Sequence, residues 1–165
     1  MKIMFVCHGN ICRSPMAECI MRHLLEEAGL DDEVTVASSA TSTEEIWNGV
    51  GNPIYPPAAA ELLRHGIDVP EREAVQLQKS DYQKYDLFIG MDSANIRNMN
   101  RIADGDSEGK IYKLLCFAGY ETNHQLVAGN DVADPWYTGD FEATYRDLLA
   151  GCEGFLQFLK EEGKL

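Results

Sequence analysis

The 165-residue sequence has no long apolar run and few basic residues. No stretch approaches the roughly 20 apolar residues of a membrane-spanning helix, and the apolar segment 1–6 is too short for the hydrophobic region of a signal peptide. Only 14 residues are Lys or Arg against 27 Asp or Glu, so the net charge is −13. This balance disfavours binding to nucleic acid or to an anionic membrane surface, and neither is expected as a partner.

The sequence also lacks the cysteine and histidine patterns of a disulfide framework or a metal site. Its five cysteines are irregularly spaced and include no Cys-x-x-Cys pair: Cys7, Cys12, Cys19, Cys116 and Cys152. No cluster of histidines or carboxylates has the spacing of metal ligands. We therefore expect no metal and no cofactor, and a cytoplasmic protein whose thiols stay reduced. Nothing in the sequence indicates an obligate partner, so a monomer is expected.

Short apolar segments alternate with segments of helical periodicity. Strands are predicted at 2–6, 34–37, 87–90 and 111–116, and helices at 14–28, 58–64, about ten residues from 93, and 141–160. Two long loops, 41–57 and 119–139, separate them. The alternation predicts an α/β fold in one domain, residues 1–165, with a parallel sheet flanked by helices on both faces. Ligands of such sheets bind beyond the carboxyl ends of the strands.

The segment from Cys7 to Ser14, at the end of the first predicted strand, has the composition of an anion site. A strand, a glycine-containing loop and a helix N-terminus together direct backbone N–H groups and the helix dipole at one point. Arg13 adds a planar fork that grips two phosphate oxygens. The same field favours the thiolate of Cys7, which is then placed to attack phosphorus. The competing interpretation is a buried core thiol at Cys7 and a surface charge at Arg13.

Other residues of this loop have supporting roles in the prediction. Ser14 precedes Pro15 and is the predicted N-cap of the helix, and its hydroxyl is also available to the sulfur of Cys7. Asn10 is suited to hold the loop by hydrogen bonds to the backbone.

The run from Val6 to Pro15 resembles the signature loop of the low-molecular-weight protein tyrosine phosphatases. That loop has Cys, five residues, Arg and Ser, with Gly-Asn in the middle. The resemblance continues along the chain at Ser38-Ser39-Ala40-Thr41-Ser42, Gly51-Asn52-Pro53, Met91-Asp92 with Asn95, and Asp134-Pro135-Trp136-Tyr137. It implies a four-stranded parallel sheet with helices on both faces. It also implies hydrolysis of phosphotyrosine, on proteins or small aryl phosphates, through a cysteinyl-phosphate intermediate.

The resemblance assigns further roles at the second long loop. Asp134 matches the family's general acid, which protonates the leaving group and later activates water. Asp131 is the local competitor, but it lacks a following proline. Trp136 and Tyr137 match aromatic residues that line a slot for a phenyl ring.

The opposite wall falls in residues 44–50, where this sequence has a short insertion relative to the family, and Trp47 is the predicted wall residue. The resemblance implies that Ser38 steadies the loop asparagine and that Asp92 is a buried acid near Arg13. It also implies reversible pairing of Cys12 with Cys7 under oxidant. The phosphate-binding loop so defined contains His8, Gly9, Asn10, Ile11, Cys12 and Ser14. No catalytic role is assigned to His8.

Three alternatives share the scaffold. Arsenate reductases need further cysteines on a segment near the third strand, and Cys116 and Cys152 lie elsewhere in the predicted fold. Protein arginine phosphatases have a small polar residue where this chain has the apolar Ile11, which favours a phenyl ring over a guanidinium. A phosphotyrosine-binding module without turnover would lack the nucleophile or the acid, and both Cys7 and Asp134 are present.

Overall fold

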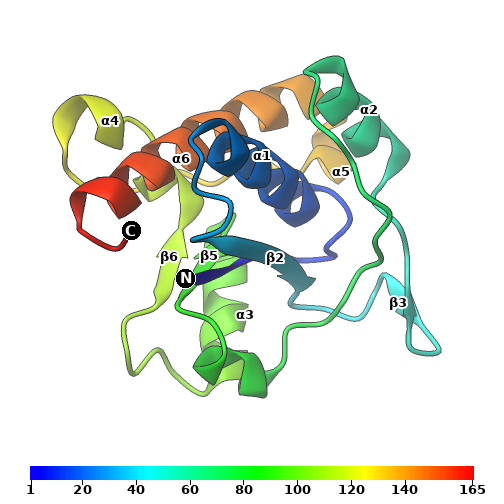
Figure 1. Cartoon of the computed structure of the whole chain (residues 1–165). Coiled ribbons are helices and arrows are strands. Elements are labelled where there is room, and N and C mark those ends of the chain that lie inside the picture. Colours follow the sequence, from blue (N-terminus) through cyan, green and yellow to red (C-terminus); the bar gives the residue numbers. More distant parts are fainter.

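The computed structural model describes residues 1–165 and contains a four-stranded parallel sheet between two layers of helices (Figure 1). The sheet order is β2-β1-β5-β6, with β1 at Lys2–Cys7, β2 at Thr35–Ala40, β5 at Leu87–Gly90 and β6 at Ile111–Lys113. The helices are α1 (Arg13–Glu27), α2 (Pro56–Arg64), α3 (Ser93–Ala103), α4 (Tyr120–Asn123), α5 (Pro135–Thr138) and α6 (Phe141–Glu161). Two 3₁₀ segments, η1 (Lys79–Gln83) and η2 (Leu114–Cys116), and a hairpin of β3 (Ile46–Trp47) and β4 (Val50–Gly51) complete the chain.

The strand order places a topological switch point at β1. From β1 the chain passes through α1 to β2 on one side, and later through α2 to β5 on the other side. Connections that leave a strand in opposite directions open a crevice at its carboxyl end, where such folds bind ligands. Cys7 is the last residue of β1 and therefore lies at this crevice.

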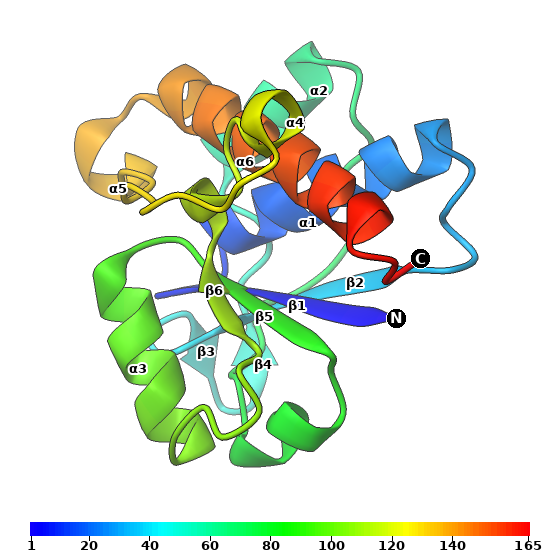
Figure 2. The same cartoon turned by 90° about the vertical axis from the view of Figure 1, so that its left-hand side faces the viewer.

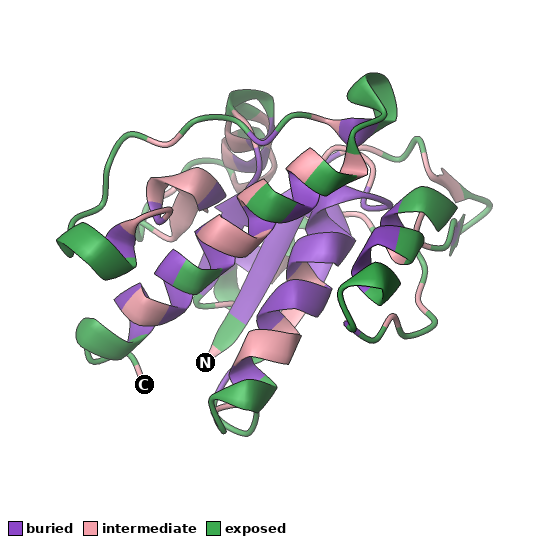
Figure 3. Ribbon diagram, turned by 90° about the horizontal axis from the view of Figure 1, so that it is seen from above, coloured by how far each residue is buried: buried purple, intermediate pink, exposed green.

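Alternation along β1 decides which core each side chain enters. Ile3, Phe5 and Cys7 belong to the larger hydrophobic core, under α1 and α6, whereas Met4 and Val6 belong to a smaller core under α3. Figure 2 shows α1, α2 and α6 on one side of the sheet and α3 on the other. Figure 3 shows buried residues along the strands and along the inner sides of α1 and α6.

The predicted fold class is confirmed, and several predicted element boundaries need correction, among them the strand expected at 34–37, which runs from Thr35 to Ala40. The expected strand 111–116 ends at Lys113, and the next residues turn into η2, where Leu114 is fully buried against Gly151 of α6. The first long loop contains the β3–β4 hairpin, and the second contains α4 and α5. The predicted helix from 58 begins two residues earlier, at Pro56.

None of the helices combines the length and the apolarity that crossing a membrane requires.

Candidate active site

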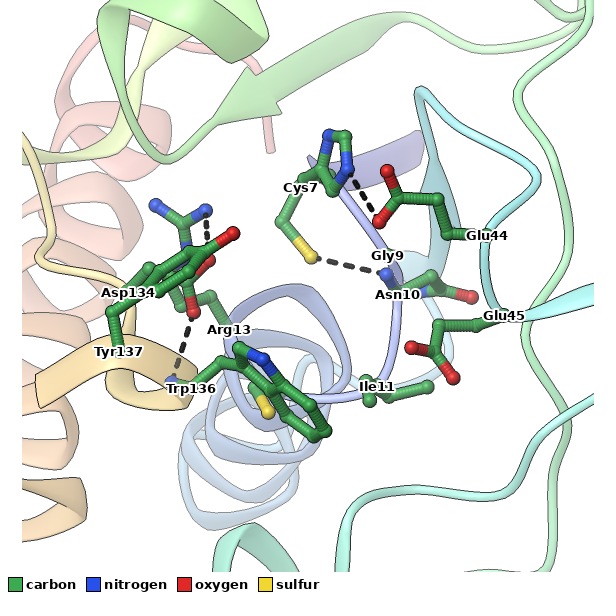
Figure 4. Close-up of a pocket in the computed structure, with 12 residues that line it drawn as sticks. Cys7, Gly9, Asn10, Ile11, Arg13, Glu44, Glu45, Asp134, Trp136 and Tyr137 are labelled. Atoms are coloured by element: carbon green, nitrogen blue, oxygen red, sulfur yellow. Dashed lines mark hydrogen bonds and ion pairs between the residues drawn. The ribbon is translucent and has the colours of Figure 1, made fainter. Parts of the chain in front are cut away.

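The loop between β1 and α1 encloses the sulfur of Cys7 with hydrogen-bonding groups (Figure 4). Cys7 is buried, its Sγ lies 3.0 Å from Ser14 Oγ, and the Asn10 amide donates to the same sulfur at 3.3 Å. Helix α1 begins at Arg13 with Cys12 as N-cap, and no side chain caps it. The expectation that Ser14 caps this helix is therefore wrong, because Ser14 lies within the first turn and its hydroxyl faces Cys7.

Most backbone amides of this loop have no acceptor within the chain. The N–H groups of Gly9, Ile11, Cys12, Arg13 and Ser14 make no intramolecular hydrogen bond. Buried amides are paired almost everywhere in folded proteins, and here the unpaired ones surround a thiol at a helix N-terminus. Such an arrangement binds anions through the amides and the helix dipole.

Arg13 is buried beside the loop and held in place by groups from distant parts of the chain. Its Nη1 donates to Asp92 Oδ2 at 2.6 Å and to the Val132 carbonyl at 2.9 Å, and its Nη2 lies 3.4 Å from Asp134 Oδ2. Burial opposes the charge, yet the pKa of Arg13 lies above its ordinary value, since Cys7 and the two carboxylates favour the cation. These contacts use three of the five donors of a guanidinium, which leaves two for an anion in the loop.

Asn10 holds the loop from inside. Its backbone is left-handed, with φ of 60°, and its side-chain amide donates to Ser14 Oγ at 2.8 Å and to Ser38 Oγ at 2.9 Å. Its carbonyl oxygen accepts from Arg72 and from the Val75 amide. The fully buried Asn10 therefore ties the loop to β2 and to the segment before η1.

Arg72 and Glu18 form an outer layer around this asparagine. Arg72 Nη1 donates to the Asn10 backbone carbonyl at 2.8 Å, and burial lowers the pKa of Arg72 from its ordinary value. Ser38 in turn donates to Glu18 Oε1 at 2.6 Å. Ser14 and Ser38, which accept hydrogen bonds from the loop asparagine, thus have further partners in Cys7 and Glu18, whereas the hydrogen bonds of Arg72 go to Asn10 alone.

The two candidate acids lie in different environments. Asp134 is the N-cap of α5, where its Oδ1 accepts from the Trp136 amide at 3.1 Å, and it lines the cavity above Cys7. Asp131 does not line the cavity. It binds Lys113 Nζ at 2.8 Å and the Ser93 amide, and the hydrogen bond from Lys113 lowers the pKa of Asp131. A carboxylate so paired is a poor proton donor, so the geometry favours Asp134.

The cavity has an aromatic wall and an acidic wall. Trp136 and Tyr137 of α5 line one side with 53% and 84% of their surfaces exposed. Glu44 and Glu45 line the opposite side (Figure 4). Trp47, the residue expected there, does not line the cavity and is 80% exposed.

Strand alternation explains the position of Trp47. Its neighbour Ile46 packs inward against Ile11, Cys12 and Ala74, so Trp47 lies on the opposite face of β3. Asn48 and Gly49 then close the hairpin in left-handed conformations, as Asn-Gly turns do.

Comparison with known proteins decides the family. The model of the low molecular weight phosphotyrosine protein phosphatases matches residues 2–165. The chain is 35% identical over 163 residues to the low molecular weight protein-tyrosine-phosphatase YfkJ of Bacillus subtilis, covering 99% of this chain and 98% of that protein. It is also 35% identical over 157 residues to the low molecular weight phosphotyrosine protein phosphatase of Sus scrofa, covering 94% and 93%. The chain belongs to the low molecular weight phosphotyrosine protein phosphatase family.

Solved structures of similar proteins share the fold. The crystal structure of B. subtilis YfkJ superposes with a TM-score of 0.86 at 33% identity and covers 98% of this chain and 96% of that one. A Drosophila arginine phosphatase superposes with a TM-score of 0.81 at 28% identity and covers 97% and 98%. The scaffold therefore also occurs in an enzyme named for another substrate.

Most residues that line this phosphatase's cavity are predictable from the sequence, but two lining residues, Glu44 and Glu45, and two supporting residues, Arg72 and Glu18, are not. Glu44 and Glu45 lie in the insertion, where Trp47 is the only aromatic residue and therefore the predicted wall residue. Arg72 and Glu18 lie at Asn10 and Ser38 only after the chain has folded. A buried asparagine in a loop needs hydrogen-bond partners. This requirement is the only feature of the sequence that points to residues such as Arg72 and Glu18, and it does not say which residues they are.

The Asn10 network gives a prediction about the stability of this family member. Asn10→Ala should lower the free energy of unfolding by about 2–4 kcal/mol, since it strains a left-handed residue and leaves buried partners unsatisfied. Asn48→Ala is the matched control, because Asn48 also has positive φ but is exposed and makes no side-chain hydrogen bond. It should cost about 1 kcal/mol. Urea unfolding measures both, and equal losses would contradict a supporting role for the network.

Proposed function

We propose that this enzyme hydrolyses phosphotyrosine monoesters on proteins, and small aryl phosphates, by two successive displacements at phosphorus. The observation that supports this most is the meeting of a buried thiol, unpaired amides, a guanidinium and a carboxylate in one cavity: Cys7, the amides of residues 9 and 11–13, the Arg13 side chain and Asp134. All these groups belong to a single chain, which supports action as a monomer. Its five cysteines are free, which suits the reducing cytosol.

In the first displacement the Cys7 thiolate attacks phosphorus and forms an S–P bond. The bond from phosphorus to the tyrosine oxygen breaks, and Asp134 donates its proton to that oxygen. Arg13 and the loop amides stabilise the charge on the phosphoryl oxygens. These groups supply the charge stabilisation without a metal or a cofactor.

In the second displacement water attacks the cysteinyl phosphate. The Asp134 carboxylate takes a proton from the water, the S–P bond breaks, and inorganic phosphate leaves. The sulfur departs as a thiolate, and its contacts with Ser14 Oγ and the Asn10 amide lower the cost of that charge.

The cavity lining supports an aromatic leaving group. Ile11 contributes an apolar side chain without a hydrogen-bonding group, and Trp136 contributes an aromatic ring. Arsenate reduction has less support, since Cys116 and Cys152 line no part of the cavity and Cys152 is fully buried.

Initial rates on four substrates test this function: phosphotyrosine, phosphoserine, phosphoarginine and arsenate with a thiol reductant. We expect phosphotyrosine to be favoured by about tenfold or more over the others, as stacking and shape permit. Orthovanadate should inhibit and EDTA should not. A faster rate on phosphoarginine, or loss of activity with EDTA, would overturn the proposal.

We also propose that Cys12 protects Cys7 from irreversible oxidation. Peroxide would convert the Cys7 thiolate to sulfenic acid, and the Cys12 sulfur would then form the disulfide with release of water. Burial, followed by the nearby Cys7, raises the pKa of Cys12 to about 12, so Cys12 must lose a proton as it attacks. Mass spectrometry after brief peroxide treatment should find a Cys7–Cys12 linkage in the wild type, and Cys7 sulfinic acid in Cys12→Ser. Sulfinic acid alone in the wild type would refute this role.

A further inference from the structure

The wall of the cavity that faces the aromatic residues carries two carboxylates, and the imidazole of His8 lies beside one of them. Glu44 and Glu45 line it, and no lysine or arginine other than Arg13 lines any part of the cavity. The charge of Arg13 is already shared by Asp92 and Asp134 and is needed at the phosphate. The part of the cavity beyond the phosphate site is therefore acidic.

Each of the two glutamates is held by a side-chain contact, Glu44 by His8 of the phosphate-binding loop and Glu45 by Asn52, which follows the hairpin. Glu44 Oε2 lies 2.9 Å from His8 Nε2, and Asn52 Nδ2 donates to Glu45 Oε2 at 2.7 Å. The Asn52 amide also donates to the Glu45 carbonyl at 2.8 Å. These contacts keep both carboxylates beside the phosphate-binding loop.

The base of the hairpin leaves little freedom for the acidic wall to move. Gly51 packs so closely on the next segment that a Cβ there would lie 1.9 Å from the Ala74 carbonyl oxygen, and Ile46 packs in the small core beneath the loop. The wall is thus a preformed part of the cavity.

A phosphotyrosine side chain seated in this cavity would bring its polypeptide past the acidic wall. The phosphate occupies the loop around Cys7, the ring lies beside Trp136, and the main chain emerges at the mouth, where the Glu44 side chain is 69% exposed. Residues next to the phosphotyrosine then lie within reach of a carboxylate.

We propose that Glu44 and Glu45 select phosphotyrosine sites that are flanked by lysine or arginine. This inference rests on the proposed phosphotyrosine hydrolysis and names the substrate class within it. A cation beside the phosphotyrosine gains a partner at the wall, whereas a flanking glutamate meets like charge in a molecule of net charge −13. Exposed ion pairs of this kind change affinity by a factor of about 1.4 to 5 each, so two of them together change it by a factor of about 2 to 25. Within this range we expect a preference of about three- to tenfold.

Three phosphotyrosine peptides that differ only at the residues flanking phosphotyrosine test the proposal: one with lysines, one with alanines and one with glutamates. The measured quantity is kcat/KM for each, at low and at high ionic strength. The wild type should prefer the lysine peptide over the glutamate peptide by about three- to tenfold, mostly through KM, and salt should reduce the preference.

The variant Glu44→Gln/Glu45→Gln should bring the lysine-to-glutamate ratio close to one. General damage to the fold would lower all three values and leave their ratio unchanged. Glu26→Gln is the matched control, since Glu26 is an exposed glutamate about 20 Å along α1 from Arg13, and it should keep the wild-type ratio.

Two outcomes would overturn the inference while the proposed function stands: a wild-type ratio near one on hydrolysed peptides, or an unchanged ratio in the double variant. If the double variant instead lowers hydrolysis of phosphoarginine and leaves the peptide ratio unchanged, the wall serves a cationic leaving group and the inference is wrong. Failure of the proposed function would appear differently, as absent hydrolysis of all three peptides.

Discussion

Cys7→Ser should lower kcat on p-nitrophenyl phosphate by about 10⁴-fold or more, while the protein still binds inorganic phosphate. A serine hydroxyl is a weak nucleophile unless a base activates it, and no base contacts this position. The neighbours of the sulfur are Ser14 Oγ and the Asn10 amide. The unpaired amides and Arg13 remain in place, so the anion site persists without the attacking atom.

Steady-state kinetics and phosphate titration by calorimetry would measure the two halves of this prediction. Cys116→Ser is the control, because Cys116 is a free, partly buried cysteine outside the cavity. The kcat of this variant should stay within about twofold of the wild-type value. Turnover by Cys7→Ser close to the wild-type rate would point to a different nucleophile. Loss of phosphate binding together with turnover would indicate a collapsed loop, which urea unfolding would reveal.

The second large effect is expected at Asp134. Asp134→Asn should slow hydrolysis of phosphotyrosine by about 10²–10⁴-fold, since the tyrosine oxygen then leaves without a proton. Asparagine preserves the shape of the side chain and an oxygen for the Trp136 amide, so the N-cap of α5 is kept. The loss should be smaller on p-nitrophenyl phosphate, because p-nitrophenolate leaves more easily without protonation.

Asp131→Asn is the control for this prediction. Asp131 is bound to Lys113 and Ser93 outside the cavity, so its replacement should change the rate by less than about threefold. A larger loss of rate in Asp131→Asn than in Asp134→Asn would argue against proton donation by Asp134. So would an equal loss of rate in Asp134→Asn on phosphotyrosine and on p-nitrophenyl phosphate.

The parts of this protein that were predictable are those set by local sequence. The alternation of apolar segments with helical ones gave the layered fold, because each element's burial follows from its own periodicity. The loop from Cys7 to Ser14 contains a thiol, backbone amides and a guanidinium within eight residues. The groups that bind phosphate are therefore close in sequence and can be recognised without knowledge of distant contacts.

Long-range packing decided the surroundings of that loop. Asp92 and Asp134 reach Arg13 from 79 and 121 residues away. The resemblance to a family implies Asp92 near Arg13, but it names Asp134 only as the general acid and not as a contact of Arg13. Arg72 donates a hydrogen bond to Asn10, 62 residues earlier in the chain, and no local sequence pattern predicts this contact. Such contacts depend on the order of β1, β2 and β5 in the sheet. A short stretch of sequence carries no information about that order.

The insertion at residues 44–50 shows the limit most clearly. The residue type of Trp47 predicts a wall residue, but side chains alternate along β3, so Trp47 points away from the cavity when Ile46 packs inward. By itself the sequence determined the layered fold and the phosphate-binding loop, because both arise from neighbouring residues. Only the tertiary structure decided that two glutamates, rather than a tryptophan, face the aromatic wall, because the orientation of β3 follows from Ile46 packing against the loop and its neighbours.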